Sequence, residues 1–329
     1  MRAGYLAAPG VVEVDDFPEP VAERAGDLVV RMHRASICGS DVHVVFHGFH
    51  DEDCLGMPGY PGHEGLGTVV ESRSETVVVG DLVLTVPIPT VGRCFAEYQL
   101  IEDTQVVTLP AGGQEDRLLM AQQYGTALYA MRMFWPEDGT LREAGTAAIT
   151  GAGSAGLFFL QLAQRAGFEH VVISDLDTRR LAVARDLGAG TTVHAPDESV
   201  TDAVMDLTGG AGADLVIEAA GYDDARAQTV AALAQQGTIG LFGYPERRGL
   251  AGFPMYDAFR KVARIQWAGG TQAEPGLVAF RDAVRHIHDG EIEVGHCLGH
   301  VHRLDDLPRA LAVAAEGGHG GVKLSLDLR

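Results

Sequence analysis

The chain has little lysine and few basic side chains for its length. Of its 329 residues, 45 are acidic and 25 are basic, which gives a formal net charge of −20. Only two of the basic residues are lysines, Lys261 and Lys323. Nucleic acids and anionic membrane surfaces bind proteins that present basic patches. The composition therefore argues against a nucleic acid or an anionic membrane as the partner.

Cysteine is also sparse, with only Cys38, Cys54, Cys94 and Cys297. No two of these cysteines have the C-x₂-C spacing, which argues against a structural zinc site with four cysteine ligands. Four cysteines are too few for a disulfide scaffold in a chain of this length. Because the residues after Met1 show no signal-peptide pattern, we expect a reduced, cytoplasmic protein.

A membrane-spanning run is also missing. The uncharged segment 144–164 is long enough to span a membrane, but it divides into a short strand, a glycine turn and an amphipathic helix. Glycine is the residue in excess, with 42 copies, and this predicts many tight turns and close backbone approaches. The length leaves room for two domains, each with its own core.

Two hydrophobic patterns divide the chain. Up to about residue 110, short alternating runs predict β-strands, and a helical period follows from Glu115 to Trp135. After Gly145, strands alternate with helices, and two of the helices end at glycines, Gly167 and Gly188. This alternation predicts an α/β fold with a doubly wound parallel sheet. Its strands are expected at 147–150, 170–174, 191–194, 214–220, 237–243 and 263–268, and a further helix at 275–289.

A dinucleotide-binding motif, G-x-G-x-x-G, occupies Gly151 to Gly156 between a predicted strand and a predicted helix. The first glycine makes the turn, Gly153 lets backbone amides approach a pyrophosphate, and the third glycine lets the helix pack on the strand. Asp175 ends the next predicted strand, where a carboxylate can accept both ribose hydroxyls. The alternative for Asp175 is an ordinary strand-end or helix-cap acid.

The same carboxylate favours NAD over NADP because it repels a 2′-phosphate. Arg179 and Arg180 keep NADP open, since either guanidinium could pair with that phosphate. Arg180 could instead stack on adenine or lie on the solvated face of its helix.

Two short runs in the β-rich part carry metal-binding side chains. They are Cys38-Gly39-Ser40-Asp41-Val42-His43 and Gly62-His63-Glu64. A thiolate and an imidazole, each near a carboxylate, suit zinc with an open coordination position. On spacing alone, a buried core cysteine and an ordinary histidine are the more frequent interpretation.

Together with the glycine motif, these runs resemble the zinc-dependent medium-chain alcohol dehydrogenases, most closely the polyol (sorbitol-type) and threonine dehydrogenase branch. Gly48 and Pro58 fall in register with the pattern of that branch. Further matches extend over nearly the whole chain: Gly80 to Val83, Phe95 to Tyr98, Leu207 to Gly210, Ala213-Asp214, Glu218 to Gly221 and Gly321 to Lys323.

The resemblance implies a GroES-like catalytic domain over residues 1–123, a Rossmann domain over 124–269, and a C-terminal segment, 270–329, that returns to the catalytic domain. It also implies a small-molecule substrate and a homodimer or homotetramer. The residues that it places at the NAD cofactor are Thr126, Gly151, Gly153, Ser154, Ala155, Gly156, Asp175, Arg180, Ala220 and Gly243.

The family chemistry implies that zinc, held by Cys38 and His63, polarises the alcohol or carbonyl oxygen while hydride moves to or from the nicotinamide. Ser40 would hydrogen-bond that oxygen and pass its proton, through the ribose hydroxyls, to His43. Asp41 would orient a zinc ligand. The alternatives are helix-cap roles for Ser40 and Asp41 and an ordinary solvated His43.

The sequence departs from the family in two places. The lobe that binds a structural zinc is missing between Pro87 and Phe95, so we expect one zinc at most. The third protein ligand, usually Cys or Glu, aligns with Gln122, and a neutral amide oxygen is the weaker ligand. Either Gln122 binds weakly, or Glu64 replaces it, or the metal is labile. Gln122 could also be a polar residue without a metal role.

The segment from Phe46 to Cys54 is rich in histidine and acids. If it borders the substrate, as in the family, it suits a polyol, sugar, cyclitol or amino alcohol; otherwise it is a solvated loop. His296, His300 and His302 are expected to share one face of a strand without a metal role. The function expected is an NAD-linked dehydrogenase of a polar secondary alcohol. The alternatives are a zinc-free quinone- or enoyl-type reductase and a non-catalytic nucleotide-binding protein.

Overall fold

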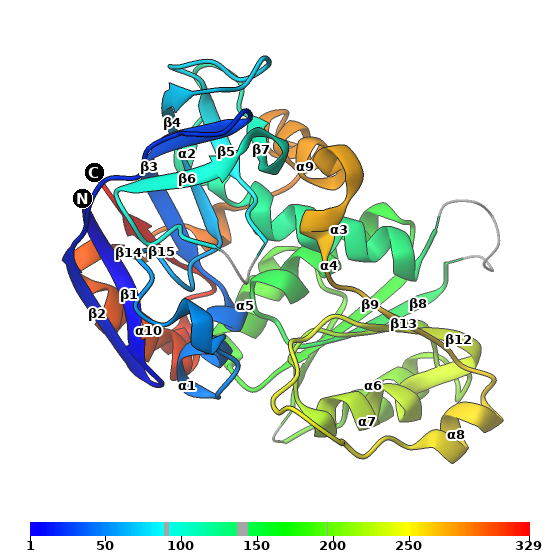
Figure 1. The fold of residues 1–329 in the computed structure, drawn as a ribbon. Coiled ribbons are helices and arrows are strands. Elements are labelled where there is room, and N and C mark those ends of the chain that lie inside the picture. The colour runs from blue at the N-terminus through cyan, green and yellow to red at the C-terminus, as the bar shows by residue number, and fades with distance from the viewer. Residues whose placement is uncertain (89–91, 137–143, 196) are drawn as a thin grey trace. The chain divides into compact units, whose positions relative to one another are not determined.

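The structure is a computed structural model that describes residues 1–88, 92–136, 144–195 and 197–329. The chain divides into two compact units (Figure 1). Unit 1 comprises Met1–Gly125 and Gly270–Arg329, and unit 2 comprises Thr126–Gly269. Within the described residues, no helix combines the length and the apolar character that crossing a membrane requires.

Unit 2 is built on a parallel sheet with the strand order β10-β9-β8-β11-β12-β13. Figure 1 shows α4 on one face of this sheet and α6 and α7 on the other. All five residues of β8 are buried, as expected for a strand covered on both faces. This doubly wound sheet confirms the predicted α/β class. The strands are β8 (Thr146–Thr150), β9 (His170–Asp175), β10 (Thr191–His194), β11 (Ala213–Glu218), β12 (Leu233–Leu241) and β13 (Arg264–Trp267), and the helices are α4 (Ser154–Arg165), α5 (Thr178–Asp186), α6 (Val200–Leu207), α7 (Asp223–Ala232) and α8 (Met255–Arg260).

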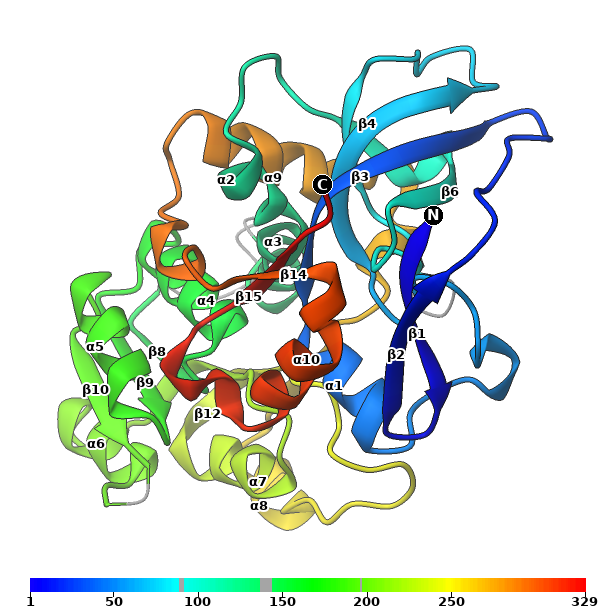
Figure 2. The same ribbon diagram turned by 90° about the vertical axis from the view of Figure 1, so that its left-hand side faces the viewer.

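Unit 1 is rich in β-structure. Its main sheet has the order β14-β15-β3-β4-β5-β7, and β6 also pairs with β3. A separate hairpin, β1–β2, lies beside α10 (Figure 2). The strands are β1 (Arg2–Ala8), β2 (Val11–Asp16), β3 (Asp27–Ile37), β4 (Glu64–Ser72), β5 (Leu82–Thr85), β6 (Tyr98–Glu102), β7 (Val106–Thr108), β14 (Val301–Arg303) and β15 (Leu324–Asp327), and the helices are α1 (Gly39–Phe46), α2 (Glu115–Leu119), α9 (Val278–His288) and α10 (Leu307–Ala315). Helix α3 (Ala121–Phe134) begins in unit 1 and continues into unit 2.

Several element ends differ from the sequence-based expectations for identifiable reasons. The expected helix at 275–289 starts only at Val278, because Gly276 and Leu277 have φ angles of 73° and 50°. α7 ends at Ala232, and β12 begins directly after it instead of at residue 237. The ammonium of Lys261 donates to three carbonyl oxygens at this end of α7, at 2.6 to 2.8 Å. A cation there satisfies the last helical carbonyls and fixes the helix end.

The expected glycine helix ends are confirmed. Gly167 follows α4 with a φ of 85°, and Gly188 follows α5 with a φ of 87°. Only glycine adopts this left-handed conformation without a steric penalty, so both helices stop where the sequence indicates.

Candidate functional site

In unit 1, the candidate metal-binding residues lie where the ends of three neighbouring strands meet. β3 ends just before Cys38, β4 begins with Glu64 just after His63, and β15 begins just after Lys323. β3 runs antiparallel to both β4 and β15, with Ser36 directly opposite Glu64. Antiparallel pairing puts the carboxyl end of one strand beside the amino ends of its neighbours. Residues from distant parts of the sequence therefore gather at this edge.

Three side chains of different chemistry converge here. One ligand atom each of Cys38, His63 and Glu64 lies within 4.8 Å of the other two. Among the described residues, no other group of three or more His, Cys, Asp or Glu side chains meets this criterion. A thiolate, an imidazole and a carboxylate are the ligand types that zinc takes in proteins. The donor set and its spacing fit one zinc ion.

Asp41 connects the cysteine to the histidine. Its carboxylate is fully buried, and one oxygen accepts the backbone N–H of Cys38 at 2.8 Å, which caps the first turn of α1. The other oxygen lies 3.0 Å from Nδ1 of His63. Nε2 of the same ring lies 3.4 Å from the hydroxyl of Ser40. Asp41 therefore both caps a helix and turns Nε2 of His63 toward Ser40, so the two interpretations of this residue are compatible.

The charges around His63 favour a cation. Burial by itself would lower the pKa of His63, but the Asp41 carboxylate and the Cys38 sulfur raise that pKa well above its ordinary value. The same negative groups would attract a metal cation, which displaces the imidazole proton when it binds. The electrostatics of the cluster agree with its ligand chemistry.

Glu64 already has a strong partner, and sequence reasoning assigned that partner no role. The Lys323 ammonium lies 2.6 Å from Glu64 Oε2, the Ser36 hydroxyl donates to the same oxygen, and all three side chains are buried. Burial would raise the pKa of Glu64, yet the charge of Lys323 and His63 lowers it. A ligand role for Glu64 would use Oε1. The available signal was the rarity of lysine and its place in the Gly321 to Lys323 match.

Gln122 lies at the start of α3, buried to 2% exposure. Its side-chain amide N–H donates to the carbonyl oxygen of His63 at 3.3 Å. The amide therefore anchors the backbone of a candidate ligand, and a bond to the metal would use Oε1. The neighbouring Gln123 accepts a hydrogen bond from Lys323 at 3.2 Å.

The stretch between Pro87 and Phe95, where the structural-zinc lobe is missing, packs against the turn that contains His63. The N–H of Cys94 donates to the carbonyl of Gly62 at 2.8 Å, and a Cβ on Gly92 would lie 2.8 Å from Cβ of His63. Burial raises the pKa of the Cys94 thiol to about 12, so this cysteine stays protonated. Residues 89–91, which belong to the same stretch, lie outside the described residues.

Side chains of the histidine-rich segment at the end of α1 and just after it contact one another. Nδ1 of His43 lies 3.1 Å from Nδ1 of His47, and Nε2 of His50 lies 3.0 Å from a Glu52 carboxylate oxygen. Asp51, Glu52 and Asp53 are exposed, as in a solvated loop. Of the three C-terminal histidines, only His302 lies on a strand, β14, while His296 belongs to a 3₁₀ turn. The expectation that these three share a strand face is wrong.

In unit 2, each glycine of the dinucleotide motif has a separate reason to be glycine. Gly151 turns the chain after β8 with a φ of 95°. A Cβ on Gly156 would lie 1.8 Å from the carbonyl oxygen of Gly151, so only glycine lets α4 start this close to the strand. A Cβ on Gly153 would have no atom within 4 Å, and no side chain caps α4 there. Open space beside the first turn of this helix, which begins at Ser154 and Ala155, fits a phosphate.

Asp175 fixes this loop at the end of β9. One carboxylate oxygen accepts the N–H of Ala152 at 2.6 Å, and the other accepts the N–H of Asp177 at 2.8 Å. Arg179 is engaged by Asp177 at 2.8 Å, and hydrogen bonding to Arg179 lowers the pKa of Asp177 to about 2. Of the two arginines considered for a phosphate, Arg180 is the half-buried one.

Glu218 organises the next strand ends. Its carboxylate is completely buried and accepts the N–H groups of Ala220, at 2.7 Å, and Gly221, at 2.5 Å. The Arg226 guanidinium lies 3.5 Å from its second oxygen and donates to the carbonyl of Gly243 at 3.1 Å. Glu218 and Arg226 thus join the turns after β11 and β12, which contain the predicted cofactor residues Ala220 and Gly243. Thr126, also predicted at the cofactor, lies half-buried in α3.

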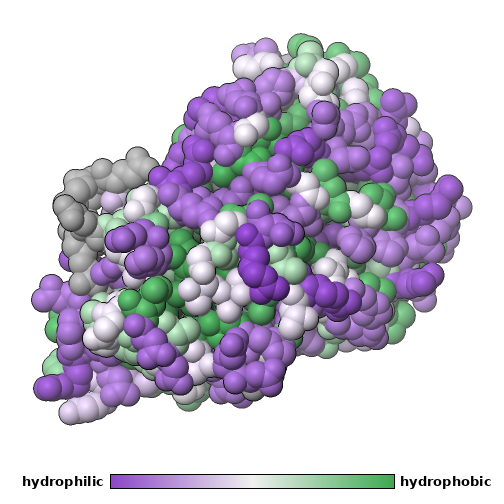
Figure 3. Space-filling view, turned by 180° about the vertical axis from the view of Figure 1, so that it is seen from behind, coloured by the Kyte–Doolittle hydropathy of each residue, from purple (hydrophilic) through white to green (hydrophobic). Residues whose placement is uncertain are grey.

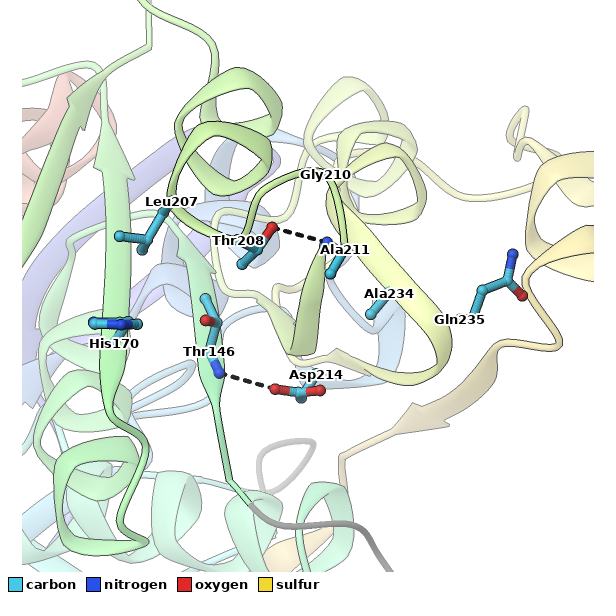
Figure 4. A pocket seen from close by; sticks show the side chains of 10 residues that line it. Thr146, His170, Leu207, Thr208, Gly210, Ala211, Asp214, Ala234 and Gln235 are labelled. Carbon is cyan, nitrogen blue, oxygen red and sulfur yellow. Dashed lines mark hydrogen bonds between the residues drawn. The ribbon is translucent and has the colours of Figure 1, made fainter.

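The opposite edge of this sheet holds a hollow of about 560 Å³ (Figure 4). Thr146, His170 and Asp214, from the amino ends of three strands, line it. Within it, the Thr208 hydroxyl accepts the N–H of Gly212 at 2.9 Å, and Asp214 accepts the N–H of Thr146 at 2.9 Å. The run from Leu207 to Asp214, part of which matches the family pattern, therefore closes a loop, and it lies away from the glycine motif.

Comparison with known proteins identifies the family. Residues 24–132 match the model for the alcohol dehydrogenase GroES-like domain, and residues 154–280 match that for zinc-binding dehydrogenases. The chain is 25% identical to L-threonine 3-dehydrogenase of Paraburkholderia phytofirmans, over 96% of each protein. It is 27% identical to the enzyme of the same name from Pyrococcus horikoshii, over 83% of this chain and 88% of the relative.

Solved structures share the fold over the full length. Alcohol dehydrogenase TADH from Thermus sp. ATN1 superimposes with a TM-score of 0.86 at 22% identity and covers 100% of both chains. The alcohol dehydrogenase of Aeropyrum pernix gives a TM-score of 0.85 at 22% identity, covering 99% of this chain and 100% of the other. These matches confirm the expected pairing of a GroES-like with a Rossmann fold. The chain belongs to the medium-chain dehydrogenase superfamily, in its threonine and polyol dehydrogenase branch, and is an enzyme of the alcohol dehydrogenase type.

Proposed function

We propose that the protein is a zinc-dependent oxidoreductase that transfers a hydride between NAD(H) and a secondary alcohol or ketone on a polar substrate. The observation that carries this proposal is the convergence of Cys38, His63 and Glu64 within 4.8 Å, beside the buried Asp41. Zinc bound there would supply Lewis acidity toward the substrate oxygen. Cys38 and His63 would hold it, with Gln122 or Glu64 as a further oxygen ligand.

Side chains around the cluster would transfer the proton of the substrate alcohol. Ser40 lies beside Nε2 of His63, at 3.4 Å, where its hydroxyl would hydrogen-bond the substrate oxygen. Ser40 would accept the alcohol proton as it passes its own proton outward through the ribose hydroxyls to His43. Asp41 would keep the His63 ring in the orientation that binding requires.

For the cofactor we propose NAD rather than NADP. The glycine cradle of Gly151, Gly153 and Gly156 suits a pyrophosphate, and Asp175 at the end of β9 suits a ribose with both hydroxyls present. The pairing of Arg179 with Asp177 supports this preference, because it satisfies one of the two guanidinium groups that could answer a 2′-phosphate. Arg180 would lie along the adenosine part.

The names of the relatives support the proposed substrate class. Sequence relatives are named L-threonine 3-dehydrogenase, whose substrate is a small β-hydroxy amino acid. We therefore include amino alcohols with polyols, sugars and cyclitols as candidate substrates. The four free cysteines support a reducing compartment such as the cytoplasm.

A homo-oligomer would explain an apolar surface of unit 2. Hydrophobic side chains are exposed along α8, at Met255, Tyr256 and Phe259, and along the edge strand β13, where Trp267 is 58% exposed. Figure 3 shows hydrophobic residues gathered on the part of this face below the grey atoms. An uncovered edge strand can pair with the same strand of a second copy around a two-fold axis. We propose a homodimer, or a homotetramer that contains it.

One experiment tests the function. Bound metal is measured first, and then NAD reduction with a panel of polyols, sugars and amino alcohols, for the wild type, Cys38→Ala and the control Cys54→Ala. Cys54 is a buried cysteine outside the cluster. We expect one zinc per chain, and we expect Cys38→Ala to lose it together with more than about 100-fold in kcat/KM, above the usual cost of a change around the ligands. Cys54→Ala should keep both.

A specific observation keeps the zinc-free reductase as the second candidate. The Glu64 carboxylate is already paired with Lys323, and the Gln122 amide is hydrogen-bonded to the backbone of His63. This leaves Cys38 and His63 as the two strong candidate ligands. A metal-free protein that reduces quinones or enoyl compounds, and is indifferent to Cys38→Ala, would replace the proposed function. Two tightly bound zinc ions per chain would contradict the expected single site.

A further inference from the structure

We propose that His43 and His47 form a second, peripheral site for a divalent transition-metal ion, separate from the Cys38, His63 and Glu64 cluster. The two residues stand one helical turn apart. His43 belongs to α1 and His47 is its C-cap, and the backbone N–H of His47 donates to the carbonyl of His43 at 3.0 Å. Residues four apart on a helical turn project from the same face. The sequence His43-Val44-Val45-Phe46-His47 thus presents two imidazoles side by side.

The ring nitrogens already lie at a chelating distance. Nδ1 of His43 and Nδ1 of His47 are 3.1 Å apart, and the ring planes meet at 77°. Zinc–imidazole bonds are about 2.0–2.1 Å long, so two nitrogens on one tetrahedral ion lie roughly 3.3 Å apart. A small rotation of the side chains would aim both lone pairs at a shared ion. Two helical histidines at this spacing are an established way of presenting two metal ligands.

The surroundings hold one ring and leave the other accessible. The ring of Phe49 packs edge-on against His43, with the centroids 5.6 Å apart, while His47 is exposed. Water can therefore fill the remaining coordination positions. The net charge of −20 favours the approach of cations to the protein as a whole.

The ligand type selects the metal. Imidazole nitrogen suits copper, nickel and zinc, and affinity at such a site rises from nickel to copper. With two protein ligands and the rest water, the ion should exchange readily and bind most tightly as Cu²⁺. Alkaline-earth ions, which prefer oxygen ligands, should not bind there.

The test is a titration of the purified protein, carrying whatever metal it retains, with Cu²⁺ and then Ni²⁺. Equilibrium dialysis gives the stoichiometry, and electron paramagnetic resonance of the Cu²⁺ form counts its nitrogen ligands. We expect one added copper per chain with two imidazole nitrogens in the wild type. His47→Ala should show one nitrogen and bind copper at least about tenfold more weakly, because the chelate is lost.

His170→Ala is the matched control, since His170 is an exposed histidine of unit 2 that lies beside Glu169 and not beside another histidine ring. It should leave the added copper unchanged. Circular dichroism melts check that His47→Ala is folded, which its exposure predicts. An unchanged copper affinity and nitrogen count in His47→Ala would overturn the site. That failure is distinct from failure of the proposed function, which depends on Cys38.

Discussion

Among the described residues, each unit buries one glutamate at a strand end next to its candidate site, and different groups compensate the two buried carboxylates. Glu64 begins β4 in unit 1 and is 1% exposed; Glu218 ends β11 in unit 2 and is 0% exposed. The ammonium of Lys323 lies 2.6 Å from Glu64. Glu218 is held by two backbone N–H groups, and the nearest cation, Arg226, is 3.5 Å away.

The pKa values of the two carboxyl groups move in opposite directions. Burial raises the pKa of both. At Glu64 the contact with Lys323, helped by His63, more than offsets burial and lowers the pKa, whereas at Glu218 the amides and the more distant Arg226 do not offset it. A full charge in direct contact compensates for lost hydration better than dipoles do. The edge with the candidate metal ligands therefore favours the ionised form of its glutamate, and the edge with the glycine motif disfavours it.

The largest effect is expected from Lys323→Met. It leaves the ionised Glu64 buried without its cation, and breaking such a pair costs about 3–5 kcal/mol of unfolding free energy. Urea unfolding followed by circular dichroism measures it. Met matches the length of the lysine stem, so packing changes little.

Two controls separate the lost charge from lost packing. Lys323→Arg keeps a cation and should cost much less. Adding Glu64→Gln to Lys323→Met removes the stranded anion and should restore most of the stability, because the double variant has no unpaired charge. A single variant as stable as the wild type would show that Glu64 is not held by Lys323.

A smaller effect is expected from Glu218→Ala. It leaves the N–H groups of Ala220 and Gly221 without their buried acceptor, whereas the guanidinium of Arg226 keeps Asp223 at 2.9 Å and the carbonyl of Gly243 at 3.1 Å. A buried donor left without a partner costs about 1–3 kcal/mol. Because the same turn is proposed to face the cofactor, the KM for NAD should rise along with the loss of stability.

Glu218→Gln is the matched variant, since its carbonyl oxygen can still accept both amide N–H groups. NADH binding, followed by fluorescence, should be nearly normal in Glu218→Gln and weakened in Glu218→Ala. Equal binding in both variants and in the wild type would remove Glu218 from the organisation of the cofactor edge, whatever its part in stability.

Charged side chains also decide how well the sequence predicts a strand. In unit 2, buried strands such as β8, at Thr146–Thr150, carry a continuous apolar or β-branched pattern, and the structure matches the predicted range of 147–150 to within one residue. In unit 1, the short alternating runs predict the start of β3 at residues 28–31 but not its continuation to Ile37. Arg34 hides its continuation, because this polar side chain is neutralised by Asp116 at 2.9 Å and Asp327 at 3.0 Å.

Residues of the candidate site likewise differ in how well the sequence predicts them. Cys38, His63 and the glycine motif are recognisable because each depends on a short local pattern. The pairing of Glu64 with Lys323 depends on β3 lying between β4 and β15, which no local spacing reveals. The assignment of Ser40, His43 and Gln122 to catalysis or metal binding stays a prediction, since the fold fixes where they lie and not what they do.

The smallest expected effect is on the pH dependence of stability, and it tests the comparison most directly. Because the pKa of Glu218 is raised, the folded protein holds this proton more tightly than the unfolded chain. Stability from this group is present below the ordinary glutamate pKa, about 4.3, and is lost as the pH rises through the raised value. The wild type should therefore gain stability relative to Glu218→Gln as the pH falls toward that window.

Asp27 supplies the control with the opposite sign. Its buried carboxylate accepts the N–H groups of Arg24 and Glu23, at 2.8 and 3.1 Å, and these bonds lower its pKa. Stability from a lowered pKa is present above the ordinary aspartate value and is lost as the pH falls through the lowered one. Relative to Asp27→Asn, the wild type should thus lose stability on acidification. Thermal melts of the three proteins, from neutral pH to below the ordinary aspartate pKa of about 3.9, should show the two differences running in opposite directions. Parallel differences would mean that Glu218 is ionised as firmly as Asp27. Two amides and a guanidinium at 3.5 Å would then suffice to keep a buried carboxylate charged.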